Sequence, residues 1–140
     1  MKVRELMTSP AVSVAPGESV EVAARTLTQY NIGALPVCGK DGRLYGVVTD
    51  RDLVIRCMAS QRPAASTPIK DVMSANVAYV SPEMDAAVAA HLMGRQQVRR
   101  LPVVEDGKLC GMLTLADLAR REDSLPDAAD ALGDISENLR

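Results

Sequence analysis

The pattern Gly-x-x-Thr-x-x-Asp occurs twice in the sequence and contains side chains that could hold a polar ligand. One copy ends with Thr49 and Asp52, and the other ends with Thr114 and Asp117. A threonine at a helix start places its hydroxyl beside free backbone N–H groups and the positive end of the helix dipole, which favour a phosphate or another anion. A carboxylate accepts hydrogen bonds, so each aspartate suits a ligand with hydroxyl donors. The two patterns are therefore candidate binding residues.

The same spacing also has a purely structural explanation. In a capping box, a threonine at the N-cap and an acidic residue three positions later satisfy each other's backbone donors without any ligand. Because the longer pattern recurs, each time after a predicted hairpin strand, we expect ligand contact in at least one copy. Capping alone is the alternative for each copy.

Arginines near both patterns add positive charge. Arg51 lies between Asp50 and Asp52, and Arg99 and Arg100 precede the second pattern. Guanidinium groups form charge-assisted, bidentate contacts with phosphate oxygens. Adjacent residues of a strand face opposite sides, so we expect only one of the pair Arg99 and Arg100 to reach a given site. The alternatives are a solvated role for this pair and, for Asp50 and Asp52, partnership with the helix dipole rather than a Mg²⁺ site.

The sequence lacks the residue sets of common enzymes and metal sites. It has no nucleophile with a base, no paired carboxylates in an apolar context and no Walker glycine loop. We expect the single histidine, His91, at a helix surface and Cys38, Cys57 and Cys110 as small buried hydrophobic residues. One histidine and three scattered cysteines supply a zinc site poorly. We therefore expect neither catalysis nor a bound metal.

The composition predicts a soluble folded chain with an aliphatic core. Of 140 residues, 47% are hydrophobic and 24% are charged, with no Phe, no Trp and three Tyr. The formal net charge of -2 argues against a general affinity for DNA or anionic membranes, and the scarcity of aromatic residues argues against single-stranded nucleic acid. No stretch approaches the roughly 20 apolar residues of a membrane span, and the first residues lack a secretion signal. We expect a cytoplasmic protein.

An internal repeat determines how these residues are arranged. Residues 3–8 align with residues 69–74 at an offset of 66, as from Met7 to Met73, and the same offset aligns residues 35–37 with residues 101–103. One residue is then lost in a turn. Beyond it the offset is 65, as from Asp52 to Asp117. The two Thr-x-x-Asp patterns are therefore equivalent positions of two copies.

Each copy predicts the element order β-α-β-β-α. The first copy has an extended piece at 11–15, a helix with Val20, Ala23, Ala24 and Leu27 on one face, strands at 34–38 and 44–48, and a helix that starts at Thr49. The second copy has the equivalent elements, with the extended piece at 77–81 and the final helix starting at Thr114.

The repeat also predicts the domain organisation. A copy of about 60 residues is marginal alone, so we expect the two copies to share one core through their sheets, related by pseudo-twofold symmetry, in an α/β (α+β) fold. The expected boundaries are residues 1–62 for repeat 1, residues 63–121 for repeat 2 and residues 122–140 for an acidic tail.

The tail differs from the rest in charge and has a weak helix signal. From Glu122 onward it has six acidic residues and one basic residue, a net of -5, which leaves +3 for the preceding chain. Ser124 with Asp127 is similar to a capping box, whereas Gly133 weakens a helix. Near-helical spacing relates Ala128, Leu132, Ile135 and Leu139. We expect a short amphipathic helix that packs on its own module or on a partner subunit, or a frayed segment that meets another protein.

With these motifs the chain resembles a tandem pair of cystathionine-β-synthase (CBS) domains, also called a Bateman module. The resemblance rests on Gly46–Asp52 and Gly111–Asp117, with Ile32–Val37 and Val98–Val103 upstream, and covers residues 1 to about 121. Members of this family bind AMP, ADP, ATP, S-adenosylmethionine and other adenosyl compounds, and some have no known ligand. The resemblance thus implies a ligand class and not one ligand.

The resemblance also implies two related clefts between the repeats. One would use Thr114, Asp117, Arg99 and Arg100 with the first-repeat residues Val12, Ile32 and Gly33. The other would use Thr49, Asp50, Arg51 and Asp52 with Gly33, Ala34 and the second-repeat residues Ala78, Tyr79 and Val98. In each, the aspartate suits ribose hydroxyls, the threonine and arginines suit phosphate, and aliphatic side chains suit adenine.

The leading hypothesis is a non-catalytic sensor that binds AMP, ADP or ATP in one or both clefts, requires no cofactor and signals to an unknown regulated protein by a change of shape or partner affinity. The resemblance further implies a disc-like homodimer of two pairs. The alternatives are a structural or interaction module with empty clefts and an accessory subunit that binds S-adenosylmethionine. Arg99 and Arg100, on a mildly basic body, favour a phosphorylated ligand.

Overall fold

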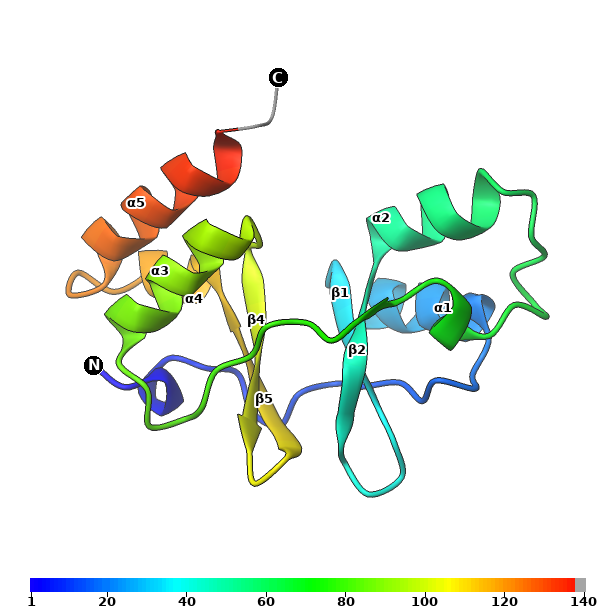
Figure 1. Ribbon diagram of the computed structural model, residues 1–140, viewed down its shortest axis with the longest axis horizontal. Helices are drawn as coiled ribbons and strands as arrows, with labels where there is room; N and C mark the ends of the chain where they lie inside the picture. The colour runs from blue at the N-terminus through cyan, green and yellow to red at the C-terminus, as the bar shows by residue number, and fades with distance from the viewer. Residues whose placement is uncertain (138–140) are drawn as a thin grey trace. The chain divides into compact units, whose positions relative to one another are not determined.

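The structure is a computed structural model that describes residues 1–137, and it divides into two compact units (Figure 1). The first-repeat unit is the continuous segment Val12–Val77. The second-repeat unit combines Met1–Ala11 with the chain from Ala78 onward. Each unit buries an aliphatic core of its own, as the composition predicts. Leu139, which was expected on the apolar face of the tail, lies outside the described residues.

The first-repeat unit contains one small antiparallel sheet, of strand order β1-β2-β3, with short helices. Its elements are α1 (Val20–Tyr30), β1 (Ala34–Cys38), β2 (Leu44–Thr49), α2 (Asp50–Asp52), the π-helix η2 (Leu53–Met58), the 3-10 helix η3 (Ile69–Asp71) and β3 (Ser74–Ala75). Leu35 of β1 lies opposite Val48 of β2, and both side chains are buried. The alternating apolar residues of this hairpin therefore supply the centre of the core.

The second-repeat unit is built from a hairpin and a larger group of helices. Its elements are the 3-10 helix η1 (Val3–Glu5), α3 (Ala86–Gln96), β4 (Arg100–Glu105), β5 (Lys108–Thr114), α4 (Leu115–Ala119) and α5 (Leu125–Ser136). Leu101 of β4 lies opposite Leu113 of β5, the same pairing as in the first repeat. The helix α5 packs on α3 and α4 (Figure 1). It has no counterpart in the first repeat.

The two longest repeat helices begin and end for local reasons. Ser19 caps α1 and Asp85 caps α3, each through a side-chain oxygen that accepts a backbone N–H of the first turn. Asn31 and Gln97 follow the last turns with left-handed φ values of 52° and 53°, which stop helix propagation. The helices α1 and α3 therefore begin and end at equivalent residues of the two repeats.

The buried face predicted for the first helix is confirmed except at one position. Val20, Ala23 and Leu27 are buried, but Ala24 is exposed. The equivalent residue of the second repeat, Ala90, is buried in the core cluster to which α5 contributes. Ala24 is exposed because nothing in the first-repeat unit takes the place of α5.

The leading segment of each repeat packs in the unit that contains the other repeat's hairpin. Thr8 exchanges two backbone hydrogen bonds of 2.9 and 3.0 Å with Met112 of β5, and the equivalent Ser74 pairs with Val47 of β2. Glycine permits both approaches: a Cβ at Gly46 would lie 2.3 Å from the Ser74 carbonyl oxygen, and one at Gly111 would lie 2.8 Å from that of Thr8. The boundaries of the compact units therefore differ from those of the sequence repeats. The repeats identify segments of similar sequence, whereas the units group segments that are in contact.

The extended pieces that open each repeat are shorter than expected. Instead of full strands at 11–15 and 77–81, a single parallel bridge joins Val14 to Val37 and another joins Val80 to Val103. Each bridge residue donates to a proline carbonyl, of Pro36 or Pro102, at 3.1 or 3.0 Å. Proline has no N–H with which to extend the ladder on that side.

The tail forms a helix that packs on its own unit. Ala128, Ala131 and Ile135 are buried, while Leu132, which was expected with them, is exposed. The capping box expected from Ser124 and Asp127 is wrong. The Ser124 hydroxyl instead donates a 2.6 Å hydrogen bond to the Leu118 carbonyl oxygen, which ties the start of α5 to α4.

Candidate functional site

Thr114 and Asp117 hold the start of α4 by reciprocal hydrogen bonds. The Thr114 hydroxyl accepts the Asp117 backbone N–H at 3.1 Å, and Asp117 Oδ2 accepts the Thr114 N–H at 2.8 Å. The capping box is therefore present. It uses only one oxygen of the carboxylate, since Asp117 Oδ1 lies 3.2 Å from the guanidinium of the exposed Arg120. The side chain of Asp117 is 10% exposed, so this second oxygen is the part that a ligand could reach.

The first repeat reproduces this geometry. The Thr49 hydroxyl accepts the Asp52 N–H at 3.1 Å, and Asp52 Oδ2 accepts the Thr49 N–H at 2.9 Å. Asp52 Oδ1 lies 3.8 Å from Arg56 Nε, and the side chain is 14% exposed. Asp50 is exposed, and one of its oxygens accepts the Arg51 N–H at 2.8 Å. Both motifs therefore cap a helix and also leave one carboxylate oxygen beside an arginine.

In the second-repeat unit, the predicted residues meet at the end of the hairpin. Arg100 pairs with Thr114 across β4 and β5, and the Arg99 carbonyl accepts the Leu115 N–H at 2.8 Å. Arg99 lies in the bend before β4 and is exposed, and Arg100, the first residue of β4, is half-buried, so the two are not neighbours within a strand as was expected. Positive charge thus lies beside the capped start of α4.

The remaining predicted residues of this unit are Ala78, Tyr79 and Val98. Ala78 and Val98 are partly buried and pack against the core cluster, whereas Tyr79 is exposed. These three are aliphatic or aromatic surfaces without charge, which suits the adenine role predicted for this part of a cleft.

In the first-repeat unit, backbone contacts bring the predicted residues together. Ala34 pairs with Thr49 across β1 and β2, and the Gly33 carbonyl accepts the Asp50 N–H at 3.1 Å. Val12 is half-buried against the core, and Ile32 is exposed. Each predicted cleft includes residues of both units.

The histidine and the cysteines of the described chain differ in burial. Residues 1–137 contain no group of three or more His, Cys, Asp or Glu side chains placed to hold a metal ion. His91 is exposed, as expected. Cys38 and Cys57 are buried, but Cys110 is only half-buried, so the prediction of three buried cysteines is wrong at that position.

Burial also determines the reactivity of two of these thiols. It raises the pKa of the Cys38 thiol above its ordinary value, and it raises the pKa of the Cys110 thiol, with a smaller contribution from the negative charge of Glu105. Raised pKa values keep a thiol protonated and poorly nucleophilic. Neither cysteine has the properties of a catalytic thiolate.

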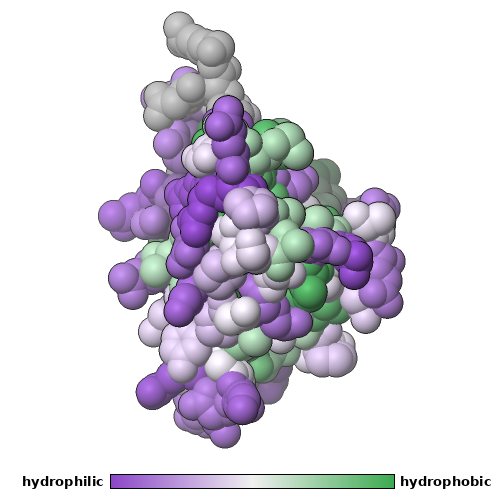
Figure 2. All heavy atoms as spheres, turned by 90° about the vertical axis from the view of Figure 1, so that its right-hand side faces the viewer, coloured by the Kyte–Doolittle hydropathy of each residue, from purple (hydrophilic) through white to green (hydrophobic). Residues whose placement is uncertain are grey.

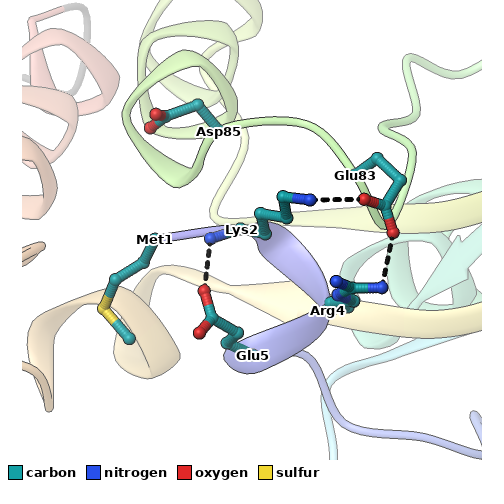
Figure 3. Close-up of a pocket in the computed structure, with 6 residues that line it drawn as sticks. All are labelled: Met1, Lys2, Arg4, Glu5, Glu83 and Asp85. Atoms are coloured by element: carbon teal, nitrogen blue, oxygen red, sulfur yellow. Dashed lines mark hydrogen bonds and ion pairs between the residues drawn. The ribbon is translucent and has the colours of Figure 1, made fainter.

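Surface pockets of the described residues were not predicted from the sequence. One, of about 500 Å³, lies at the N-terminal end of the second-repeat unit and is lined by Met1, Lys2, Arg4, Glu5, Glu83 and Asp85 (Figure 3). Glu83 forms ion pairs with Lys2 at 2.7 Å and with Arg4 at 2.8 Å, so these three charges of the pocket are paired. Glu5 and Asp85, the other two carboxylates of the lining, accept the backbone N–H groups of Lys2 and Ala87, so the pocket has charges of both signs.

Another pocket is an apolar groove of about 430 Å³ in the first-repeat unit, between α1 and η2. Its lining includes Ala24, Leu53, Val54 and Met58. The signal in the sequence is the run of apolar residues that follows Asp52. Among the described residues, no helix is long and apolar enough to span a membrane.

Comparison with known proteins identifies the family of this chain. The family model of the CBS domain matches the chain twice, at residues 3–58 and 69–124. CBS domain-containing protein YhcV of Bacillus subtilis is 38% identical over 134 residues, which cover 96% of this chain and 94% of that protein.

Solved structures share the fold. Hypoxic Response Protein I, crystallised with two coordinated zinc ions, has a TM-score of 0.81 at 33% identity, over 86% of this chain and 98% of that chain. CBSX2 in complex with AMP has a TM-score of 0.74 at 31% identity, over 85% and 93%. The CBS domain pair of protein MJ0100, in complex with 5′-methylthioadenosine and S-adenosyl-L-methionine, has a TM-score of 0.77 at 25% identity, over 86% and 94%.

These matches confirm the fold class expected from the repeat, a mixed arrangement of helices and strands in two CBS repeats. They also confirm the resemblance drawn from the Thr-x-x-Asp motifs and their surrounding strands. The chain belongs to the CBS domain family.

Proposed function

We propose that the protein is a non-catalytic regulatory module that binds an adenine nucleotide through its two Thr-x-x-Asp motifs. The observation that carries this proposal is the position of Asp117, whose Oδ2 caps α4 while Oδ1 meets only the exposed Arg120. A ribose can donate its hydroxyl hydrogens to Oδ1 if Arg120, whose side chain is 73% exposed, turns aside. Asp52 has the equivalent free position beside Arg56.

Phosphate binding follows from the neighbours of Thr114. Arg99 is exposed next to the capped helix start, and the chain before Glu122 has a net charge of +3. An anionic ligand gains from both the local guanidinium and the overall charge of this segment. The complex of CBSX2 with AMP supports this ligand class.

S-adenosylmethionine is the second candidate, because the similar CBS pair of MJ0100 binds it together with 5′-methylthioadenosine. Both ligands share the adenosine that the aspartate would hold, but they lack phosphate. Selectivity for phosphorylated ligands therefore distinguishes the two candidates.

A ligand panel tests the proposal. Thermal shift and calorimetry would compare ATP, ADP, AMP, S-adenosylmethionine and NADH, with and without Mg²⁺. A ligand at one hundred times its Kd adds about 2.7 kcal/mol of stability, which appears as a shift of several degrees. No response to any adenosyl compound at millimolar concentration would contradict the proposal.

Two matched substitutions separate ligand binding from capping. Asp117→Asn and Asp52→Asn keep an oxygen that accepts the threonine N–H but remove the negative charge. If the aspartate holds ribose, each variant weakens binding at one site while the melting temperature without ligand changes little. Unchanged affinity in both variants would leave capping as the only role.

The proposal also includes a cytoplasmic setting and a way of signalling. Three free thiols suit a reducing compartment such as the cytoplasm. The nucleotide would act by binding two states of the protein unequally, which changes the affinity for a regulated partner as the cellular nucleotide ratio shifts. The module would work as a homodimer.

A further inference from the structure

Arg56 connects the ligand motif of the first repeat to a distant part of the same unit. It lies one helical turn after Asp52, and its Nε is 3.8 Å from the Asp52 Oδ1 that the proposed function assigns to ribose. Its Nη1 donates hydrogen bonds to the carbonyl oxygens of Val72, at 3.2 Å, and Met73, at 3.0 Å. One guanidinium therefore contacts both the candidate ligand oxygen and the backbone at the end of η3.

The two carbonyl groups belong to a short segment that leads to the second repeat. Val72 ends η3, and β3 begins directly after Met73. Beyond β3 the chain continues to Ala78, where the second-repeat unit resumes. The hydrogen bonds of Arg56 thus hold the chain shortly before it passes from one unit to the other.

This segment has few other contacts that could hold it. β3 is two residues long and pairs with β2 only through Ser74 and Ala75. The preceding η3 is tied to the chain after η2 by an ion pair of 2.7 Å between Arg62 and Asp71, both of them partly exposed. Segments with few buried contacts open locally at a low cost in free energy. Loss of the Arg56 hydrogen bonds should therefore raise the frequency of local opening here.

The second repeat lacks this connection within residues 1–137. The arginine beside Asp117 Oδ1 is Arg120, which is 73% exposed and whose side chain bonds to no other residue of that range. The repeat aligns Arg56 with Arg121, which is exposed and forms no side-chain hydrogen bond or ion pair in the same range. A ligand at Asp117 would displace an arginine that holds nothing else, whereas a ligand at Asp52 would displace one that holds the end of η3.

The helix that carries Arg56 is also unusual. η2 is a π-helix, in which the Ala59 N–H bonds to the Val54 carbonyl oxygen, five residues earlier, at 2.8 Å. Such turns are rare and occur frequently at functional sites, whereas the second repeat has the α-helix α4 after its motif. The Arg56 side chain is 48% exposed. Figure 2 faces the side of this unit that carries α1 and α2 and shows hydrophilic side chains that reach solvent beside apolar ones.

We propose that ligand binding at Asp52 is transmitted through Arg56 to residues 72–75, and that binding at Asp117 has no such effect. This rests on the proposed function, because it requires a ribose at Asp52 Oδ1. A hydroxyl that donates to this oxygen takes the place of Arg56 Nε, so the guanidinium moves away and its hydrogen bonds to Val72 and Met73 break. The segment before the second repeat then opens more often. Coupling between two events is reciprocal, so the same contacts lower the affinity of Asp52 for the ligand.

Hydrogen exchange of the full chain, followed by mass spectrometry, tests this transmission. It is measured without ligand, with adenosine and with AMP. Exchange of residues 69–77 should become about fivefold faster when ligand is bound at Asp52, the opposite of the protection that a ligand usually gives. Arg56→Met keeps an unbranched apolar side chain but removes the guanidinium. In this variant the segment should exchange fast without ligand, and ligand should add nothing. Unchanged or slower exchange of residues 69–77 in the parent protein with bound ligand would overturn the proposal.

Two matched variants distinguish transmission from a purely structural role of Arg56. Arg62→Met removes the other contact of η3, the ion pair with Asp71, without touching Asp52. It should speed exchange of residues 69–77 but leave the further effect of ligand intact, and loss of that effect would overturn the proposal. Arg120→Met removes the arginine beside Asp117. Neither it nor the parent protein should show ligand-induced opening of residues 3–9, which are equivalent to residues 69–75, and opening there would overturn the difference between the repeats.

Affinity supplies a readout that a structural role would not change. Adenosine carries ribose and no phosphate, so the lost charge of Arg56 has little effect on its binding. In an Asp117→Asn background, Arg56→Met should bind adenosine about fivefold more tightly by calorimetry, while Arg62→Met should not differ from the parent. Equal or weaker binding by Arg56→Met would overturn the proposal.

The outcomes separate this inference from the proposed function. Binding that Asp52→Asn weakens, without any change in the exchange of residues 69–77, counts against transmission through Arg56 and leaves the proposed function standing. Failure of adenosine, AMP and ATP to bind at all would overturn both.

Discussion

Thr114 and Asp117 form a closed pair in which each side chain accepts the other residue's backbone N–H, at 3.1 and 2.8 Å. The pair stabilises the first turn of α4, where backbone donors would otherwise lack partners. Its stability role and its proposed ligand role use different atoms, since the Asp117 oxygen assigned to ribose is not the one that caps the helix. Several substitutions can therefore separate the two.

Removing the Thr114 hydroxyl tests the stability role. Thr114→Ala should lower the free energy of unfolding by about 1 kcal/mol, the usual cost of losing a side-chain N-cap. Thr114→Ser keeps the hydroxyl and is the control. Urea unfolding followed by circular dichroism measures both. An equal loss in the two variants would mean that the methyl group, and not the cap, supplies the stability.

A methyl group at Gly46 should separate β3 from β2. The added Cβ would lie 2.3 Å from the Ser74 carbonyl oxygen, which is backbone and cannot rotate away. We expect Gly46→Ala to destabilise the protein by about 1–3 kcal/mol, as other overpacking substitutions do. Gly17→Ala meets no atom within 4 Å and is the control, with an expected effect near zero or slightly stabilising. Equal melting temperatures for both variants would contradict the close approach.

Gly133 offers a stabilising substitution. It lies within α5 on the exposed side, and a Cβ there would meet no atom within 4 Å. Gly133→Ala should therefore stabilise the protein by up to about 1 kcal/mol through helix propensity alone. Gly94→Ala is the same change inside α3, but its Cβ would lie against Asp134, so a smaller gain or a loss is expected. If Gly133→Ala had no effect on thermal unfolding, α5 would not contribute to the cooperative unit.

Glu83 should make stability depend on pH. The hydrogen bond from Lys2, followed by the charges of Arg4 and Lys2, lowers the pKa of Glu83 from its ordinary value of about 4.5. A lowered pKa stabilises the fold above the unfolded value, and this contribution is lost as the pH falls through the folded value. Glu83→Gln should therefore have the lower melting temperature at pH 7, and the difference should shrink below about pH 4.5.

The control for this titration is Glu122→Gln, which removes an exposed carboxylate of the tail. Its melting temperature relative to the parent protein should not converge in the same way at acidic pH. A gap between the parent protein and Glu83→Gln that stays constant from pH 7 to pH 3 would rule out the titration of Glu83 as the cause.

Much of the fold could be predicted from local patterns. The hairpins, both capping boxes and the buried residues Val20, Ala23 and Leu27 follow from periodicity and turn chemistry, because these depend on neighbours in the chain. The Thr-x-x-Asp motifs could also be found, since they recur at equivalent positions of a repeat.

The features that could not be predicted depend on contacts between distant segments. Nothing near Thr8 in the sequence indicates that it pairs with Met112. Ser124 has the sequence of an N-cap, but its hydroxyl finds a better acceptor in the Leu118 carbonyl when α5 folds back on α4. Ala24 and Ala90 are identical in type, and only the presence of α5 makes one exposed and the other buried. The groove on α1 was missed for this reason.

The division of the chain into a continuous and a discontinuous unit also has a consequence for its synthesis. Val12–Val77 contains every segment that the first-repeat unit needs, so this unit can fold once residue 77 has left the ribosome. Met1–Ala11 is made first but must wait for β5, because Thr8 has its partner at Met112. Val3 and Leu6, which are buried in the finished protein, remain without their core until the second half of the chain emerges. The N-terminal segment is therefore the part of a nascent chain most open to capture by chaperones or by another copy of the protein.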